Sequence, residues 1–467
     1  MRILGPDGRP IETGPPVSEE IRKMVENARA LADQGHLQPA LQQMAIAFQG
    51  DVASDLVLDT TCALLARMAQ ITGAEENPEQ ELFEKLRQNR DDPAAYYQTG
   101  EHFFQLQQPS VARAFLARAK ELKGDIVDEL SQAIDVNYAQ ALMDMGDYEG
   151  AIAAFHALND KYGGLPIWLI LEMAECYALL RRLDEAEAVY QVAPPEAAAQ
   201  FEGMEAVREE VGDLLARVHD FDGEDMDLRD WYYVQTRSVL LETNPDENSG
   251  GRFDFFQPTE EEAAYLIGIA AALLDIKGYA PNRILWLGEH SEPLARAFAQ
   301  WWEVRDEDVR AYRPGDNTDS QEELSLLVMN HSYDVFALPD QEAFVDLAQA
   351  RAGLITFALD MRWAERQPMV PDLAGFLSQA CNLPWEPRVQ IDPAQQTITP
   401  IEETRDAQTV AADLARQFPS EAECDQVARD ILEDLSICTD LILDHRDGEL
   451  IRRPMVTHSP IQPSQPG

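Results

Sequence analysis

Hydrophobic side chains recur through the first 220 residues at the three- and four-residue spacing of amphipathic helices. In residues 136–158, Ala139 lies on the first of two expected helices and Gly146 marks the turn between them. Ala151 and Phe155 follow on the second helix. Alanines allow two antiparallel helices to approach closely, and the phenylalanine fills the space beside the next pair. This segment therefore predicts a helical hairpin.

The same pattern recurs at a nearly constant interval. Ala112 and Ala151 are 39 residues apart, and Ala151 and Ala186 are 35 apart. Intervals of this length indicate a stack of two-helix repeats. Arg181 replaces the turn glycine in the last copy, which weakens the pattern without breaking it. Together these positions resemble the tetratricopeptide repeat family.

Further copies extend the pattern in both directions. A copy near the start carries Ala28 and Gly35 at matching positions, and a degenerate repeat fits residues 55–88. Residues 195–218 predict a closing helix with a charged outer face, as the end of a repeat array requires. We therefore expect four to five repeats.

The resemblance implies a superhelix whose concave face is formed by the first helix of each hairpin. Carried over to this chain, the binding positions of that face are Tyr97, Gln98, Glu101, Phe104, Asn137, Gln140, Trp168, Glu172 and Glu175. They predict an acidic and aromatic groove for a helical or extended partner that carries Arg or Lys beside apolar anchors. Phe104 and Trp168 have an alternative role as core residues between hairpins.

From residue 258 onward the chain alternates between helical and strand patterns. Strands separated by helices of about ten residues predict a parallel sheet built from right-handed βαβ units. The predicted fold is thus an all-α tetratricopeptide-type helical repeat array followed by an α/β Rossmann-like parallel-sheet domain. A short strand at 231–241, paired with 252–256, is expected at the junction between them.

Each element of the second half has an expected position. We expect strands at residues 283–288, 309–314, 333–339, 353–360 and 396–403. We expect helices at residues 258–278, 292–302, 320–331, 340–350 and 372–383, and two acidic helices within 406–439. His331 would then end a helix and interact with the helix dipole.

Ligands of parallel sheets bind beyond the carboxyl ends of the strands. The possible ligand pocket there consists of Gly288, Glu289, His290, Ser291, Asp340 and Asp360. Its first turn has one glycine, and Glu289 would repel a phosphate. We therefore expect no cofactor. The spacing of histidines and cysteines also predicts no metal site.

The formal net charge is −47, and only six of the 37 basic residues are lysines. Such a surface repels phosphate backbones and anionic lipids, so nucleic acid and membranes are not expected partners. Three explanations of the acidity stay open: a salt-adapted or GC-rich proteome, attraction to a basic partner, and nucleic-acid mimicry.

Five scattered cysteines match neither a disulfide framework nor a zinc motif, and the N-terminal residues do not form a signal peptide, which together predict a cytoplasmic location. The expected domains are a flexible N-terminus (1–20), repeats with a capping helix (21–219), a β-rich junction (220–257), the α/β domain with a helical C-terminal part (258–458) and a disordered tail (459–467).

These patterns favour a non-enzymatic scaffold or adaptor that binds a partner protein or peptide in the repeat groove, with self-association also open. The alternative is an enzyme or small-ligand sensor whose α/β domain is transferase-like, for example related to methyltransferases or nucleotide-sugar enzymes. A faint similarity to methyltransferase domains lacks their glycine-rich first loop.

Overall fold

The chain separates into two units in the computed structural model. The first comprises Met1–Leu180 and Ala188–Ala193, and the second comprises Arg181–Glu187 and Pro194–Gly467. The structure describes residues 18–72, 78–106, 108–201, 203–221, 223, 225–246, 249–313, 324–338, 344, 353–362, 370–392, 397–401 and 403–435.

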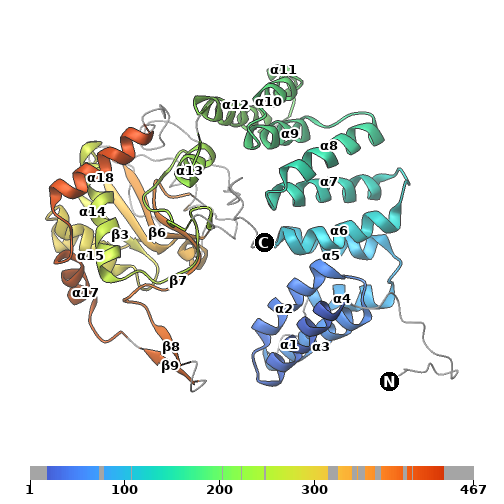
Figure 1. Cartoon of the computed structure of the whole chain (residues 1–467), viewed down its shortest axis with the longest axis horizontal. Helices are drawn as coiled ribbons and strands as arrows, with labels where there is room; N and C mark the ends of the chain where they lie inside the picture. Colours follow the sequence, from blue (N-terminus) through green and yellow to red (C-terminus); the bar gives the residue numbers. More distant parts are fainter. Residues whose placement is uncertain are drawn as a thin grey trace. The chain divides into compact units, whose positions relative to one another are not determined.

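Helical hairpins build the first half of the chain, and Figure 1 shows α5 to α8 as stacked antiparallel helices. The helices are α1 (Glu19–Asp33), α2 (Leu37–Gly50), α3 (Asp55–Thr72), α4 (Pro78–Gln88), α5 (Pro93–Gln105), α6 (Pro109–Lys123), α7 (Glu129–Asp144), α8 (Tyr148–Tyr162), α9 (Ile167–Leu179) and α10 (Leu183–Tyr190). The predicted repeat array is therefore confirmed, including the copy without a clear motif, which forms α3 and α4.

Turns with a left-handed backbone connect the two helices of three hairpins. Gly35 and Gly146 adopt φ angles of 92° and 76°, which glycine reaches without steric cost. Arg181 occupies the equivalent turn with a φ of 57°. Its guanidinium donates a hydrogen bond of 2.7 Å to the carbonyl of Phe221. The chain therefore keeps the turn geometry at Arg181 without the glycine.

Small residues set the distance between the helices of each hairpin. Ala112, Ala139 and Ala151 are completely buried, as the repeat pattern predicts. A Cβ atom added to Gly100 on α5 would lie 2.8 Å from Cγ of Leu116 on α6, so only glycine fits there. Close helix approach thus depends on small side chains at these positions.

A buried carboxylate links three helices of the array. Asp135 on α7 accepts hydrogen bonds from Nζ of Lys120 at 2.6 Å and Nζ of Lys161 at 2.8 Å. The hydroxyl of Tyr162 donates a third bond of 3.0 Å. Burial alone raises the pKa of Asp135, but these bonds outweigh it, so its pKa lies below the ordinary value of 3.8. Two of the six lysines of the chain therefore neutralise one carboxylate.

The second unit contains a seven-stranded sheet and the helices that cover it. Its elements are α11 (Pro195–Ala198), α12 (Met204–Asp220), α13 (Leu228–Thr236), β1 (Val239–Leu240), β2 (Phe253–Phe256), α14 (Glu260–Ile276), β3 (Arg283–Leu287), α15 (Glu292–Trp301), η2 (Asp306–Asp308), β4 (Val309–Ala311), β5 (Ser325–His331), η3 (Ser332–Ala337), β6 (Leu354–Arg362), β7 (Leu373–Cys381), α17 (Ala407–Ala415) and α18 (Glu421–Asp434). A separate antiparallel pair consists of β8 (Arg388–Asp392) and β9 (Thr397–Ile401). Among the described residues, no helix is both long and apolar enough to cross a membrane.

All strands of the large sheet are parallel, in the order β1-β7-β6-β5-β3-β4, and β2 also pairs with β7. Counted from β3, the strands β3 to β7 follow the order 2-1-3-4-5, which is common in doubly wound sheets. After β3 the chain adds β4 on one side and then β5 on the other side, so the direction in which strands are added reverses between β3 and β5. Such sheets bind ligands at this switch point. The predicted Rossmann-like architecture is therefore confirmed.

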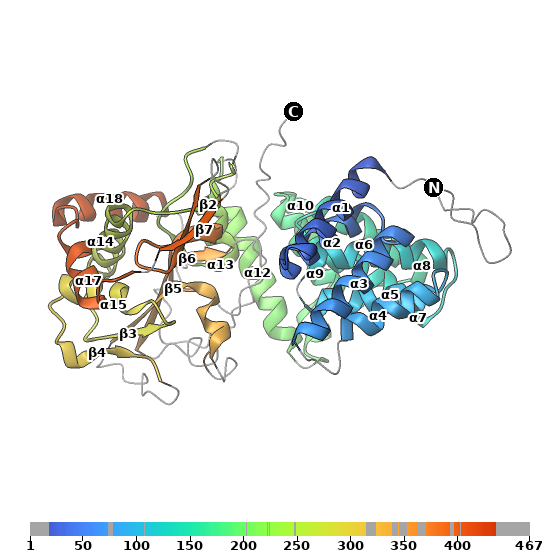
Figure 2. The same cartoon turned by 90° about the horizontal axis from the view of Figure 1, so that it is seen from below.

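Helices cover both faces of this sheet. Figure 2 shows α14 and α18 on one side of β6 and β7, and α13 on the other. On the first face, the ring of Phe298 in α15 lies 5.1 Å from that of Phe357 in β6. On the second face, Tyr232 of α13 packs with Met361 and Leu377. Because both faces are covered, the central parts of β5, β6 and β7 are mostly apolar, and polar side chains concentrate near their carboxyl ends.

Four elements differ from the expected ones. The expected helix at 320–331 is strand β5 over its described part, and the expected helix at 372–383 is strand β7. Residues 333–339 are mostly the 3₁₀ helix η3 and not a strand. Residues 231–241 contain the end of α13 and β1, and β1 pairs with β7 instead of with 252–256. Short strands buried on both faces lack the alternating pattern, so periodicity alone cannot distinguish them from buried helices.

Replacing Asp135 with Asn should destabilise the repeat unit by about 1–3 kcal/mol at neutral pH, because two lysines lose a buried counter-charge. The folded pKa of Asp135 lies below the unfolded value, so its contribution is present above pH 3.8 and is lost as the pH falls through the folded pKa. Urea denaturation followed by helical circular dichroism measures the difference. Asp160→Asn, at an exposed position of α8, is the matched control; equal stability of the two variants at pH 7 would contradict this role.

Candidate functional site

The predicted binding positions lie on the first helices of three successive hairpins, α5, α7 and α9, and we call them the first-helix face. The nine residues are Tyr97, Gln98, Glu101, Phe104, Asn137, Gln140, Trp168, Glu172 and Glu175. None of them is buried: Gln98 is exposed and the other eight are half-buried. Phe104 packs against the hydrophobic core with its covered part. The face is therefore accessible to a partner.

Hydrogen bonds connect this face from one hairpin to the next. The hydroxyl of Tyr97 donates to Oε1 of Glu101 at 2.9 Å, and the side chain of Asn137 on α7 is near enough to Tyr97 to affect its pKa. Burial and the bond to Glu101 raise the pKa of Tyr97 to about 12. From α7 to α9, Nε2 of Gln140 donates to Oε1 of Glu172 at 3.1 Å. The three helices thus present one continuous polar row.

Acidic groups gather around the α7–α9 part of the face. The thiol of Cys176 is completely buried beneath it. Burial raises the pKa of this thiol, and the charges of Glu175, Glu172 and Asp144 raise it further. Asp144 belongs to this group although the repeat pattern does not predict it. A negative potential is therefore concentrated where a ligand of the first-helix face would lie.

A second candidate site lies at the carboxyl ends of the strands in the α/β unit. There the imidazole of His331, at the end of β5, bridges two carboxyl groups. Nδ1 lies 2.9 Å from Oδ2 of Asp360 on β6, and Nε2 lies 2.8 Å from Oε1 of Glu386 beyond β7. His331 is 5% exposed and Asp360 is fully buried. Charged groups are rarely buried without such pairing.

Further donors orient both carboxyl groups. The hydroxyl of Ser378 on β7 donates to Oδ1 of Asp360 at 2.6 Å. The side-chain amide of Asn330 donates to Oε1 of Glu386 at 2.8 Å, and the backbone N–H of Leu383 donates to Oε2 at 3.0 Å. Each carboxyl group therefore has a fixed position before any ligand arrives.

The same cluster extends to the turn after β3. The backbone N–H of Asn330 donates to the hydroxyl of Ser291 at 2.8 Å. Gly288 has a φ of 96°, and a Cβ atom there would lie 2.3 Å from Oδ2 of Asp334. The β3 turn and the end of β5 are thus in contact at the switch point of the sheet.

Burial and charge shift the pKa values of this cluster in opposite directions. Burial alone lowers the pKa of His331, but the bonds to Asp360 and Glu386 raise it to about 9. Burial raises the pKa of Asp334 to about 6 and, together with nearby carboxylates, that of the Cys381 thiol far above its ordinary value. For Glu386, the bond from His331 outweighs burial and lowers the pKa.

Aromatic and cationic groups stack beside the imidazole. The ring of Tyr333 lies parallel to the ring of His331 at 4.7 Å. The guanidinium of Arg362, at the end of β6, lies 4.0 Å from the centre of the Tyr333 ring. The stack keeps the imidazole plane in one orientation.

Three members of the predicted ligand pocket, Gly288, Ser291 and Asp360, belong to this cluster. His290 contributes its carbonyl oxygen, which accepts from Nδ2 of Asn330 at 3.0 Å, and Glu289 is exposed. Asp340 lies outside the described residues. The expectation that His331 ends a helix is wrong, because it ends strand β5.

Sequence analysis did not predict the other members of the cluster: Asn330, His331, Asp334, Ser378, Cys381 and Glu386. Residues 330 and 331 directly follow the apolar run at 326–329, and residue 334 lies three positions further on. Assigning that run as a strand would have placed them at the ligand-binding end of the sheet. A strand assignment for 373–381 would have added Ser378 and Cys381.

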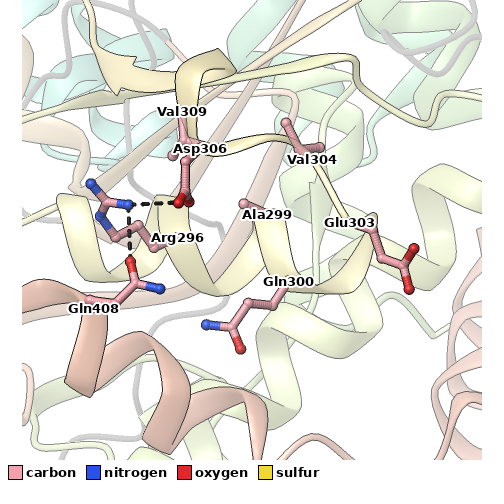
Figure 3. Close-up of a pocket in the computed structure, with 8 residues that line it drawn as sticks. All are labelled: Arg296, Ala299, Gln300, Glu303, Val304, Asp306, Val309 and Gln408. Carbon is pink, nitrogen blue, oxygen red and sulfur yellow. Dashed lines mark hydrogen bonds and ion pairs between the residues drawn. The ribbon is translucent and has the colours of Figure 1, made fainter.

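A pocket of about 390 Å³ lies elsewhere in the unit, between α15 and the start of β4 (Figure 3). It is lined by Arg296, Ala299, Gln300, Glu303, Val304, Asp306, Val309 and Gln408. One guanidinium nitrogen of Arg296 lies 3.0 Å from Oε1 of Gln408 and 3.8 Å from Oδ1 of Asp306. Because the pocket adjoins the amino end of β4, it is not at the edge where parallel sheets bind ligands.

The hairpin stack and its first-helix face define a helical repeat protein, and the second unit adds a parallel-sheet domain. The tetratricopeptide repeat family matches residues 142–207, which run from α7 into α12. The first half of the chain is therefore a tetratricopeptide-type repeat array.

Solved structures include 28 chains that match this one. One is pilF of Pseudomonas aeruginosa, with 17% sequence identity and a TM-score of 0.25; the match covers 43% of this chain and 85% of that one. No curated protein matches the chain. The tetratricopeptide assignment therefore depends on the repeat match and on the hairpins themselves.

Replacing Asp360 with Asn should destabilise the α/β unit by about 3–5 kcal/mol, because the buried imidazolium loses one of its two counter-charges. Hydrogen–deuterium exchange of peptides from β5 and β6 measures the effect locally, and the variant should exchange faster there. Asp254→Asn, at an exposed position of β2, is the control. Unchanged protection of β5 and β6 in the Asp360 variant would show that the ion cluster contributes no stability.

Proposed function

We propose that this protein is a scaffold or adaptor that binds a partner protein or peptide on the first-helix face. The observation that carries the proposal is the continuous row of partly exposed side chains across α5, α7 and α9. Tetratricopeptide repeats generally bind proteins through this kind of surface, and the charge and shape of the row determine which partners fit.

The chemistry of the face favours a basic segment with apolar anchors. Glu101, Glu172 and Glu175 provide carboxylates, and half-buried Phe104 and Trp168 provide aromatic surface beside them. Arg side chains pair with carboxylates in bidentate geometry and stack on aromatic rings. A helical or extended segment with Arg or Lys at intervals of three or four residues fits these positions.

Reversing the charge of Glu101, Glu172 and Glu175 to Lys should abolish capture of the native partner, because like charges across an interface cost several kcal/mol. Affinity purification from the native cell, quantified by mass spectrometry, measures the loss. We expect the triple variant to recover at least tenfold less of each partner that the unchanged protein captures.

The matched control reverses three glutamates on second helices, Glu81, Glu121 and Glu149, whose side chains are exposed. It makes the same change in net charge on a different face of the array. Partner capture should survive in this variant. Equal recovery by both triple variants would exclude the first-helix face as the binding surface.

The buried cluster at the strand ends favours a second candidate function for the α/β unit, the binding of a small ligand or ion. Its location at the switch point of a parallel sheet supports this role. The donor atoms of the cluster indicate what kind of ligand it would bind.

A further inference from the structure

We infer that His331, Asp360 and Cys381 form a binding site for a zinc-type divalent cation. One ligand atom from each residue, a ring nitrogen, a carboxylate oxygen and the thiol sulfur, lies within 4.8 Å of the other two. His331 and Asp360 are buried and Cys381 is half-buried. His331 and Cys381 end β5 and β7, and Asp360 lies two residues before the end of β6, the strand between them. The sheet therefore brings together residues that are 50 positions apart in sequence.

The donor set selects the class of cation. One nitrogen, one oxygen and one sulfur ligand suit Zn²⁺, whereas Mg²⁺ and Ca²⁺ prefer oxygen alone. Three protein ligands leave the fourth tetrahedral position for water or another ligand. When the cation binds, two protons pass to solvent: the thiol proton of Cys381, so that the thiolate becomes a ligand, and the Nδ1 proton of His331, so that the neutral imidazole becomes a ligand.

The distances need little adjustment to accept the cation. Two ligand atoms on one tetrahedral zinc lie about 3.3 Å apart for nitrogen and oxygen, and about 3.6 Å for nitrogen and sulfur. Nδ1 of His331 and Oδ2 of Asp360 are 2.9 Å apart. The sulfur of Cys381 lies within 4.8 Å of both atoms, and closing this separation to about 3.6 Å completes the geometry.

The surroundings provide the supporting hydrogen bonds that metal sites use. A zinc-bound imidazole usually donates its other N–H to a carboxylate. Glu386 occupies this position at 2.8 Å from Nε2 of His331, and Ser378 fixes the free oxygen of Asp360. The side-chain oxygen of Asn330 is buried without a hydrogen-bond partner in the described part of the chain. Such an acceptor suits a water molecule or other donor held at this end of the sheet.

Part of this arrangement needs no cation, because an imidazolium between two carboxylates is stable by itself. In that explanation Cys381 is not a ligand, and its side chain contributes only to packing. The two explanations therefore differ in whether the thiol becomes a ligand.

Cobalt replaces zinc in such sites and reports thiolate ligation by absorption. The full-length protein, stripped of metal with a chelator, should bind Co²⁺ with a near-ultraviolet sulfur-to-cobalt charge-transfer band and the intense visible bands of four-coordinate cobalt. Added Zn²⁺ should remove both. Cys381→Ser should lose the charge-transfer band, and Cys424→Ser, at a buried thiol of α18, should keep it.

A variant that keeps all three ligands distinguishes weaker metal binding from loss of folding. Glu386→Gln keeps the three ligands and should retain the band while weakening affinity by about 10- to 100-fold. Absence of the band in the unchanged protein would overturn the site. So would a band that persists in Cys381→Ser, since another thiolate would then hold the cobalt, or cobalt binding without the band, since surface carboxylates would then hold it.

Discussion

The repeat half of this protein depends on one packing constraint: the two helices of a hairpin must pack so closely that only alanine or glycine fits at their contact. Fully buried Ala112 and Ala151 and the glycine at position 100 satisfy it. The constraint fixes the spacing of the helices, and the spacing fixes which side chains stay partly exposed on α5, α7 and α9. The shape of this surface therefore depends on small residues buried between the helices.

Packing of this kind can be recognised in a sequence because it repeats. Residues equivalent to Ala139, Gly146 and Ala151 recur at nearly constant intervals, so the stack of helical hairpins could be predicted. Arg181 shows the limit of the pattern: the left-handed turn persists without its glycine. The hydrogen bond from Gln140 to Glu172 needed the structure, because offsets do not specify contacts between hairpins.

The α/β half was less predictable for a physical reason. β5 and β7 are buried on both faces, so their sequences carry no alternation and can be mistaken for buried helices. The parallel-sheet class of this half was predicted, but β5 and β7 were predicted as helices. His331 and Cys381, at the ends of these two strands, were therefore not predicted, whereas Gly288 after β3 and Asp360 near the end of β6 were. A chemical site made by neighbouring strands becomes visible only when every strand is assigned.

The pairing of β1 and β2 with β7 has a consequence for synthesis on the ribosome. Residues 239–256 leave the ribosome more than 120 residues before residues 373–381, to which they pair. At about 5–20 residues per second, these two edge segments wait roughly 6–25 s for their partner strand. During that time Phe253 and Phe256 lack Phe376 of β7, the ring that both contact in the folded sheet. The β2 segment therefore stays unpaired until β7 has been synthesised.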